Sequence, residues 1–425
     1  MQPTMLLIVA IAASASTLFI VLIIQNATSR ERKVDYQISP CSTGDPTFRR
    51  CMDHLLGPPL VGGNSIRSLI NGDEIFPAMM QAIRSAESSI TFETYIYWSG
   101  DIGRAFSELL AERAAAGVRV HVLLDWLGSA KLDANALQKM KNAGVHVEKY
   151  RPLRWYNLSR VNSRTHRKIL VVDGRVGFIG GVGIADQWQG NAEGPEHWRD
   201  SHFQVEGPAV AHLQAAFLDN WLKTRHEVLN EDAFFPELKS AGDALAQVFK
   251  SSPREGSGSV RLMFLMSIAV AKRQILIANS YFVPDDGCVD ALVAARKGNV
   301  EIAVIVPGHH TDTAVTRRAS RSRWGKLLEA GVKIYEFQPT MYHCKVMVVD
   351  ECWTTVGSTN FDNRSFRLND EANLNVLNEA FAKNQIRVFS DDLKRSSEVS
   401  LADWRNRPRL EKIADFLAGL FRSQV

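Results

Sequence analysis

The sequence predicts an α/β fold of two similar lobes in a pseudo-twofold arrangement, each a mixed β-sheet flanked by helices, with one N-terminal transmembrane helix. An internal duplication and a regular alternation of β-branched runs with helical stretches predict the lobes. An uncharged apolar run near the N-terminus predicts the membrane helix. The chain has 425 residues and is 45% hydrophobic, which is enough to bury a core in each lobe.

The duplication extends over most of the chain. GRAFSELLAERAAAGVRVHVLLD and LQKMKNAGVHVEKYRP in the first copy match CVDALVAARKGNVEIAVIVP and WGKLLEAGVKIYEFQP in the second. The match aligns Tyr95 with Tyr281 and Gly144 with Gly331, and only the first copy then inserts LRWYNLSRVNS. Such a repeat predicts two units of the same fold.

Within each copy, the spacing of apolar residues distinguishes strands from helices. The predicted strands include ITFETYIY, VRVHVLLD and KILVVD, whereas GRAFSELLAERAAAG has the apolar spacing of a helix that ends at glycine. Near-continuous apolar strands between helices indicate a sheet covered on both faces. The predicted lobes are residues 64–235 and 258–425, separated by a linker over 236–257 that runs into SSPREGSGS.

The N-terminal apolar run, residues 5–25, is predicted to be a single-pass anchor in the cell's inner membrane, followed by a juxtamembrane linker over 26–63. A cleaved signal peptide is the alternative, because Ala13 to Ala15 resembles a processing site. The apolar run continues beyond that site and no basic residue precedes it, which favours a retained anchor.

The side of the membrane is indicated by charge and by cysteine usage. Arg30, Arg32 and Lys33 follow the apolar run, so the positive-inside rule places the body of the protein in the cytoplasm. Cys41 and Cys51 could instead close a small loop, which would require an oxidising compartment. The chain has five cysteines and no CxxC pair, a pattern more typical of scattered free thiols.

The strongest chemical signal is the motif HxKxxxxD, which occurs once in each copy at equivalent positions. The first match contains His166 and Lys168, and the second contains His343 and Lys345. Residues two apart on a strand project from the same face, so each copy presents an imidazole beside an ammonium group. Two matches at repeat-equivalent positions favour one shared catalytic cavity between the lobes.

Two histidines and two lysines around one cavity suit phosphodiester transfer without a metal or other cofactor. One neutral imidazole can attack phosphorus and form a phosphohistidine, while the other exchanges a proton with the leaving and incoming alcohols. The ammonium groups can stabilise charge on the non-bridging oxygens. The sequence therefore predicts an enzyme that breaks and remakes phosphodiester bonds.

Carboxylates are expected to set the tautomers of the histidines. Asp200 and Glu371 are the best candidates, and each follows one of the two motifs along the chain. The motif aspartates, Asp173 and Asp350, are counted with the catalytic set. Their position at the strand ends also favours a role in holding the local turn.

With these residues in view, the sequence resembles the phospholipase D superfamily, and within it the bacterial cardiolipin synthases. The extended motif HxKxxxxDxxxxxxGSxN is complete in the second copy and includes Ser358 and Asn360. FETYIYW, WRDSHFQVEGP, NSYFVPD and LNDEAN also match the family. The resemblance covers nearly all of the chain after residue 64.

The resemblance implies a role for each site residue. His166 would be the nucleophile and His343 the general acid and base, with Asp200 and Glu371 as acidic partners. One phosphatidylglycerol would give its phosphatidyl group to His166, and a second lipid alcohol would accept it. The first copy departs from the family pattern, because Gly183 stands where an asparagine is usual.

Lipid is predicted over nucleic acid as the substrate class. The first copy's insertion and its flanks mix Arg164 and other arginines with Trp155 and Tyr156, which suits either lipid headgroups or single-stranded nucleic acid. Arg164, together with the tyrosines at 95 and 281, is expected to bind substrate. The formal net charge is only +4, far from that of a dedicated nucleic-acid-binding protein.

The C-terminal segment LADWRNRPRLEKIADFLAGLFRSQV predicts an amphipathic helix. Its apolar stripe with neighbouring basic residues suits a helix that lies on a membrane, and docking of that stripe onto the protein's own core is the alternative. A second basic cluster, Arg317 to Arg323 beside Trp324, suits a ligand surface or a solvated helix face.

Three functions remain open from the residues. The first is phosphatidyl transfer to a lipid alcohol at the membrane, with no obligate protein partner expected. The second is hydrolysis, in which water resolves the same intermediate, since the motif does not distinguish water from an alcohol. The third is an anchored binding protein with a vestigial site, and the intact His and Lys pairs in both copies argue against it.

Overall fold

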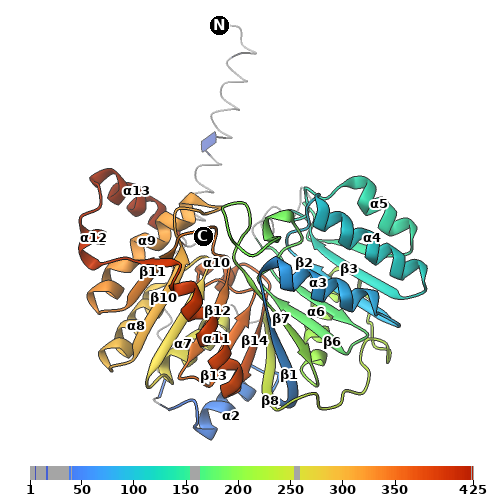
Figure 1. Ribbon diagram of the computed structural model, residues 1–425, viewed down its shortest axis with the longest axis horizontal. Helices are drawn as coiled ribbons and strands as arrows, with labels where there is room; N and C mark the ends of the chain where they lie inside the picture. The colour runs from blue at the N-terminus through green and yellow to red at the C-terminus, as the bar shows by residue number, and fades with distance from the viewer. Residues whose placement is uncertain are drawn as a thin grey trace.

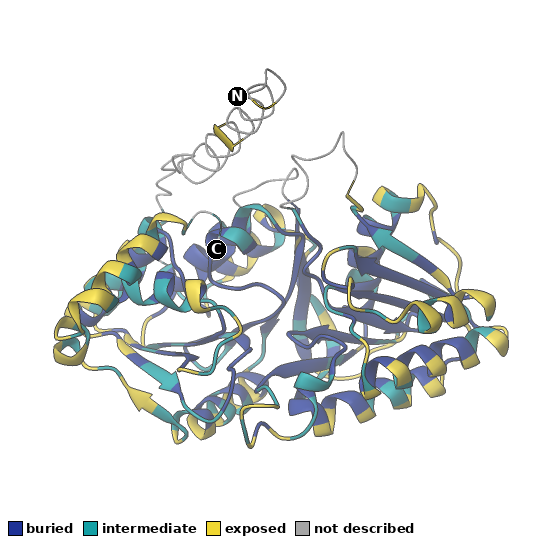
Figure 2. Cartoon of the chain, turned by 90° about the horizontal axis from the view of Figure 1, so that it is seen from above, coloured by how far each residue is buried: buried dark blue, intermediate teal, exposed yellow. Residues whose placement is uncertain are grey.

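The computed structural model describes residues 41–153, 163–252 and 259–422, together with Met5, Ser16, Thr17, Ile38, Ser39 and Gln424. Through this part of the chain runs a 15-stranded mixed sheet with helices on both faces (Figure 1). In Figure 2 most strand residues are in the colour of buried residues, whereas most of the exposed residues lie on the helices and loops around the sheet. The α/β prediction with two similar halves is confirmed.

The first half contributes the strands β1 (Val61–Ile70), β2 (Ser89–Thr94), β3 (Arg119–Asp125), β4 (His146–Tyr150), β5 (Ile169–Val172), β6 (Val176–Gly180) and β7 (Ser201–Glu206). The second half contributes β8 (Ala244–Ser251), β9 (Gln274–Asn279), β10 (Glu301–Pro307), β11 (Lys333–Phe337), β12 (Lys345–Val349), β13 (Trp353–Gly357), β14 (Glu371–Leu377) and β15 (Ser396–Glu398). The order across the sheet is β15-β11-β10-β9-β12-β13-β14-β8-β1-β7-β6-β5-β2-β3-β4. Apart from the edge strand β15, the order on one side of the β8–β1 pair repeats that on the other.

Helices cover both faces of this sheet. In the first half they are α3 (Asn71–Arg84), α4 (Asp101–Ala115), α5 (Ala134–Asn142) and α6 (Val210–Arg225). In the second half they are α7 (Ser259–Ala269), α8 (Asp286–Lys297), α9 (Ala314–Glu329), α10 (Asn363–Arg367), α11 (Glu379–Leu393), α12 (Leu401–Arg405) and α13 (Arg409–Leu420). Residues of α6 and α11 share one apolar core with strands from both halves, so a common core joins the halves on that face.

The predicted linker over 236–257 is wrong, because it contains β8. This strand pairs with β14 of the second half and with β1 of the first, both antiparallel, and it therefore joins the two halves into one sheet. The Pro, Gly and Ser residues that suggested a linker begin only as β8 ends. Residues 253–258 lie outside the described part of the chain.

The predicted linker over 26–63 is wrong in its second part. It contains α2 (Pro46–Leu55) and the start of β1. Phe48 and Met52 of α2 are buried in the core of the second half, where the Phe48 ring lies 5.1 Å from that of Trp353. The chain therefore packs against the second half before it enters the first.

The predicted membrane span over residues 5–25 lies outside the described residues, except for Met5, Ser16 and Thr17. Among the residues that are described, no helix has both the length and the apolar character to cross a bilayer. Cys41 and Cys51 carry free thiols, in agreement with the favoured interpretation of the cysteines.

Candidate active site

The two HxKxxxxD motifs begin at the same edge of the sheet. His166 and Lys168 lie directly before β5, which runs antiparallel to β2, so they lie beside the carboxyl end of β2. In the second half, Lys345 begins β12 and pairs with Asn279 at the carboxyl end of β9. The alternation of side chains on a strand then directs the histidine and the lysine of each motif to one side.

Backbone pairing between the halves brings these two motifs together. The His166 amide donates to the carbonyl of Asp370 over 2.8 Å, and the His343 amide donates to the carbonyl of Arg199 over 2.7 Å. Asp370 and Arg199 closely precede the equivalent strands β14 and β7. Each motif segment is therefore held by the other half of the molecule.

The acidic partners are exchanged in the same way. His166 Nδ1 lies 3.0 Å from both carboxylate oxygens of Glu371, and His343 Nδ1 lies 2.8 Å from Oδ2 of Asp200. Both carboxylates are fully buried. Each histidine thus takes its carboxylate from the opposite half, and neither half holds a complete site.

These hydrogen bonds determine which ring nitrogen can react. An ionised carboxylate only accepts, so Nδ1 of each histidine carries the proton and donates it. Nε2 of a neutral ring then keeps its lone pair for attack on an electrophile. Burial would raise the pKa of Glu371, but the charge and hydrogen bond of His166 outweigh it and hold that pKa below its usual value.

Burial and positive charge keep both imidazoles easy to deprotonate. Burial lowers the pKa of His166 to about 4, with Glu371 opposing this effect and Lys168 adding to it. Burial and then the charge of Lys345 lower the pKa of His343, against the opposing effect of Asp200. Lys345 also lowers the pKa of His166, and Lys168 that of His343, so each lysine is within electrostatic reach of both rings.

The two ammonium groups are fixed by the backbone of their own motifs. Lys168 Nζ donates to the carbonyl oxygen of His166, and Lys345 Nζ to that of His343, each over 2.7 Å. Burial lowers the pKa of Lys168 to about 7 and also lowers that of Lys345. Of the residues that the structure describes, none form a cluster of histidines, cysteines and carboxylates able to hold a metal ion.

Ser358 and Asn360 support the site from the second half. Ser358 Oγ donates to Oε2 of Glu371 over 2.5 Å, which fixes the carboxylate that orients His166. Asn360 Oδ1 accepts from Ser280 Oγ over 2.7 Å, and Ser280 in turn accepts from Lys345 over 2.8 Å. Both side chains therefore hold other site residues in place.

In the first half, a residue that the sequence analysis missed takes over the role of Ser358. Trp188 Nε1 donates to Oδ2 of Asp200 over 2.9 Å, and the indole packs edge-on against His343 at 5.3 Å between ring centroids. A Cβ atom at Gly181 would meet the Asp200 carboxylate at 2.3 Å, and one at Gly183 would meet Ile96 and the indole. The glycines make room, and the tryptophan supplies the hydrogen bond that Ser358 supplies in the other half.

The two aligned tyrosines are not structural equivalents. Ile169 and Val346 occupy the same place in the two motifs, and their partners across the sheet are Glu93 and Ala278. Counting two residues on from these partners, Tyr95 corresponds to Ser280, which is one residue before Tyr281. The alignment of the two tyrosines is therefore wrong by one residue.

Both tyrosines nevertheless lie beside a catalytic histidine. The Tyr95 ring is 5.4 Å from His166, with the ammonium of Lys168 5.7 Å from its centre. Tyr281 lies 6.4 Å from His343, and its hydroxyl donates to Asp312. Their predicted contact with substrate is consistent with these positions.

Arg164 is buried next to the first motif, with its guanidinium 3.6 Å from the Asp125 carboxylate and in contact with the backbone of Arg151. Trp155 and Tyr156 of the insertion lie outside the described residues. Binding of substrate by Arg164 stays a prediction, since its described contacts are with protein.

Counting Asp173 and Asp350 with the catalytic residues is wrong on geometry. Asp173 lies at the far end of β5, and seven residues of extended chain place it roughly 20 Å from His166. Its carboxylate accepts from the amides of residues 87–89 over 2.7–2.9 Å, and Asp350 accepts from those of residues 272–274 over 2.7–3.0 Å. Both aspartates have left-handed backbone with φ of 51°, so they hold turns, as their strand-end position indicated.

We expect Asp173→Ala to lower the free energy of unfolding by about 2 kcal/mol, because three amides lose a charged acceptor. Thermal unfolding of the full chain in detergent measures the change. The matched control is Asp391→Ala, which removes only an exposed pair with Lys394 and should leave the unfolding temperature nearly unchanged. Equal unfolding temperatures for the two variants would contradict the turn-holding role.

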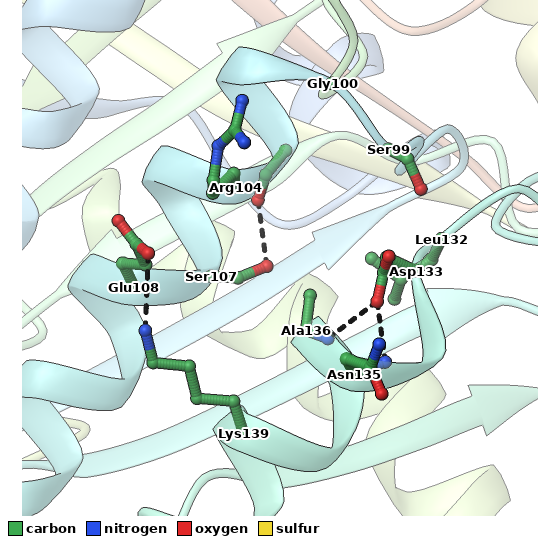
Figure 3. A pocket seen from close by; sticks show the side chains of 11 residues that line it. Ser99, Gly100, Arg104, Ser107, Glu108, Leu132, Asp133, Asn135, Ala136 and Lys139 are labelled. Atoms are coloured by element: carbon green, nitrogen blue, oxygen red, sulfur yellow. Dashed lines mark hydrogen bonds and ion pairs between the residues drawn. The ribbon is translucent and has the colours of Figure 1, made fainter.

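A surface hollow of about 440 Å³ lies between α4 and α5, apart from the histidines (Figure 3). Its charged side chains are engaged with each other, since Lys139 pairs with Glu108 at 3.3 Å and Arg104 with the neighbouring Asp101. Asp133 caps the first turn of α5. The hollow holds none of the groups that the chemistry needs, so the buried cluster of histidines, lysines and carboxylates where the halves meet is the candidate active site.

Comparisons with known proteins agree with this fold. A family model described as "Cardiolipin synthase, PLD-like domain" matches residues 79–220 and 264–393. Cardiolipin synthase A of Pseudomonas putida (strain GB-1) is 34% identical over 372 residues, which are 87% of this chain and 77% of that protein. The cardiolipin synthase of Alkalihalophilus pseudofirmus is 34% identical over 366 residues, covering 85% and 73%.

Among solved structures, the crystal structure of phosphatidylserine synthase from Haemophilus influenzae Rd KW20 has a TM-score of 0.69. It is 14% identical in sequence and covers 88% of this chain and all of its own, so the likeness concerns the fold. The fold and the paired motifs define an enzyme of the phospholipase D superfamily, a phosphatidyltransferase. Within that superfamily, the chain belongs to the cardiolipin synthase family.

Proposed function

We propose that this enzyme makes cardiolipin from two molecules of phosphatidylglycerol through a covalent phosphatidyl-histidine intermediate. The observation that supports this most is the crossed pairing of each motif histidine with a buried carboxylate of the other half. It leaves Nε2 of each histidine free of the carboxylates, and both lysines are close enough to lower the pKa of both rings. We take cardiolipin as the product because the similar proteins are named cardiolipin synthases.

In the first step, Nε2 of neutral His166 attacks phosphorus and the bond to the glycerol oxygen breaks. The proton on Nε2 of His343 passes to that oxygen, so free glycerol leaves. Lys168 and Lys345 stabilise the charge on the non-bridging oxygens. The negative phosphodiester favours the protonated form of His343, which opposes the effect of burial on its pKa.

In the second step, neutral His343 takes the proton from the terminal hydroxyl of the headgroup glycerol in the second phosphatidylglycerol. The resulting oxygen attacks phosphorus, the bond to His166 breaks, and cardiolipin forms. Atoms and charge balance, since the proton lost by His343 in the first step is regained in the second. Hydrolysis would follow the same path with water as the acceptor.

The lipid substrate also agrees with an anchor over residues 5–25 and a cytoplasmic catalytic body at the inner membrane, both of which we propose from the sequence. Incubation of the purified full chain with phosphatidylglycerol in detergent tests the reaction. We expect cardiolipin and glycerol in equal amounts. Phosphatidic acid as the sole lipid product would indicate a hydrolase, and the absence of turnover would overturn the proposal.

Replacement of Trp188 tests whether its hydrogen bond to Asp200 does in the first half what the Ser358–Glu371 hydrogen bond does in the second. Trp188→Phe keeps an aromatic ring against His343 but removes the N–H that donates to Asp200. We expect kcat to fall about tenfold, the effect of losing roughly 1.4 kcal/mol, with little change in KM. An unchanged kcat would show that the indole only fills space.

The pH dependence follows from the lowered pKa values of the cavity. Lys168 and His343 both need their proton in the first step, and this proton is lost as the pH rises through each pKa. Because burial lowers the pKa of His343 below its usual value and that of Lys168 to about 7, we expect kcat/KM to be declining already as the pH approaches 7 and to fall further above it. An ordinary lysine would keep its charge to about pH 10. A value of kcat/KM that stays constant to about pH 9 would contradict the lowered pKa values of Lys168 and His343.

A further inference from the structure

The helix α13 is attached to the protein by its polar side. Asp415 is 2% exposed and its carboxylate lies 3.3 Å from Arg407 and 3.9 Å from Arg318 and Arg321. Arg321 also pairs with Glu411 at 3.4 Å. Arg318 and Arg321 of α9 therefore dock α13, whereas Arg317 and Arg323 pair with Glu336 and Asp286. The predicted basic cluster is thus engaged with carboxylates of the protein.

The opposite side of α13 is apolar and exposed. Leu410 and Phe416 are 81% and 65% exposed. The exposed apolar side chains at this spacing, which we name the outer face, are Leu410, Ile413, Phe416, Leu417, Leu420 and Phe421. The predicted alternative, in which this stripe docks onto the protein's own core, is therefore wrong.

The outer face belongs to the same edge of the molecule as the active site. Beyond α13, the carbonyl oxygen of Gln424 accepts a hydrogen bond from Arg364 of α10 over 3.2 Å. Arg364 is only four residues after Asn360, which belongs to the active site. Other exposed apolar residues occupy this edge: Leu127 and Leu153 follow β3 and β4, and Val315 follows β10. In Figure 1, α13 lies on the side away from α2.

Basic residues accompany this apolar surface. Arg405, Arg409 and Lys412 are exposed on α12 and at the start of α13. Apolar side chains next to exposed cations suit a surface in which acyl chains lie beneath anionic headgroups. A water-facing helix would bury the apolar side and expose Asp415, which is the reverse of the arrangement observed.

We infer that the outer face of α13 inserts into the lipid bilayer and holds the active-site edge against the membrane, where substrate enters. The inference rests on the proposed lipid substrate and adds the surface that admits it. The bilayer explains the polar docking, the exposed apolar stripe, the flanking cations and the apolar residues on the rest of the edge. A second copy of the chain explains only the apolar stripe.

Photolabelling of the full chain tests this directly. The chain is reconstituted in phosphatidylglycerol-containing vesicles in which some lipids carry a diazirine on the acyl chain, and labelled peptides are mapped after irradiation. We expect label within residues 409–421 and none around Leu55, which is 63% exposed on α2. An unlabelled α13 would overturn the inference.

A matched pair of variants separates membrane insertion from chemistry. Leu417→Glu should lower turnover of long-chain phosphatidylglycerol in vesicles about tenfold, while Leu55→Glu leaves it unchanged. Both variants should turn over a short-chain, monomeric phosphatidylglycerol at the unmodified rate, which shows that they fold. Equal loss on both substrates would overturn the inference. If the unmodified chain turned over neither substrate, the proposed function would be wrong. Photolabelling would then still show whether the outer face of α13 enters the bilayer.

Discussion

His166→Ala is expected to lower kcat by on the order of 10⁴-fold or more, because it removes the atom that bonds to phosphorus. The ring is buried and held by Glu371 and by the backbone of Asp370, so water is poorly placed to replace it. Cardiolipin formation from phosphatidylglycerol in detergent measures the effect.

The control for this variant is Glu371→Gln, which keeps the size of the side chain but removes its charge. The amide oxygen of the new side chain could still accept from Nδ1 of His166, so we expect a smaller loss, about 10- to 100-fold by analogy with changes around other oriented histidines. Activity of His166→Ala above that of Glu371→Gln would show that His166 is not the nucleophile.

His343→Ala is expected to block turnover of phosphatidylglycerol to a similar extent, for a different reason. Without the proton from His343, the glycerol oxygen would have to leave as an alkoxide. A phosphatidyl ester of a phenol that is acidic enough to leave without a proton should avoid this requirement in the first step.

The two substrates therefore distinguish the two histidines. His343→Ala should release the phenol in a single burst and then stop, because no base activates the acceptor. His166→Ala should release none. If both variants released the phenol at the same rate, the assignment of separate roles would be wrong.

Much of this arrangement could be predicted from the sequence, because a duplicated motif carries its own internal check. The repeat predicted the two halves, and the spacing of His166 and Lys168 predicted that both face one cavity. Asp200 and Glu371 were found as carboxylates at equivalent places. Their exchange between the halves could not be predicted, because it depends on how β7 and β14 lie across the β1–β8 junction.

The remaining errors have local physical causes. The strand β8 was hidden by the Pro, Gly and Ser residues that follow it, and its pairing with β1 is a long-range contact. Trp188 was missed because a lone tryptophan carries no motif, although the glycine in place of an asparagine at position 183 was a signal that something fills that space. The docking of α13 by Asp415 depends in part on Arg318 and Arg321, which are distant in sequence, so the helix pattern alone could not orient it.

The whole scheme depends on two imidazoles, each oriented by the opposite half, acting on one phosphorus atom. Mass spectrometry of His343→Ala, quenched after reaction with the phenyl ester, tests this most directly. We expect one phosphatidyl group per chain on the peptide that contains His166. A group attached to any other residue, or none despite release of the phenol, would contradict it.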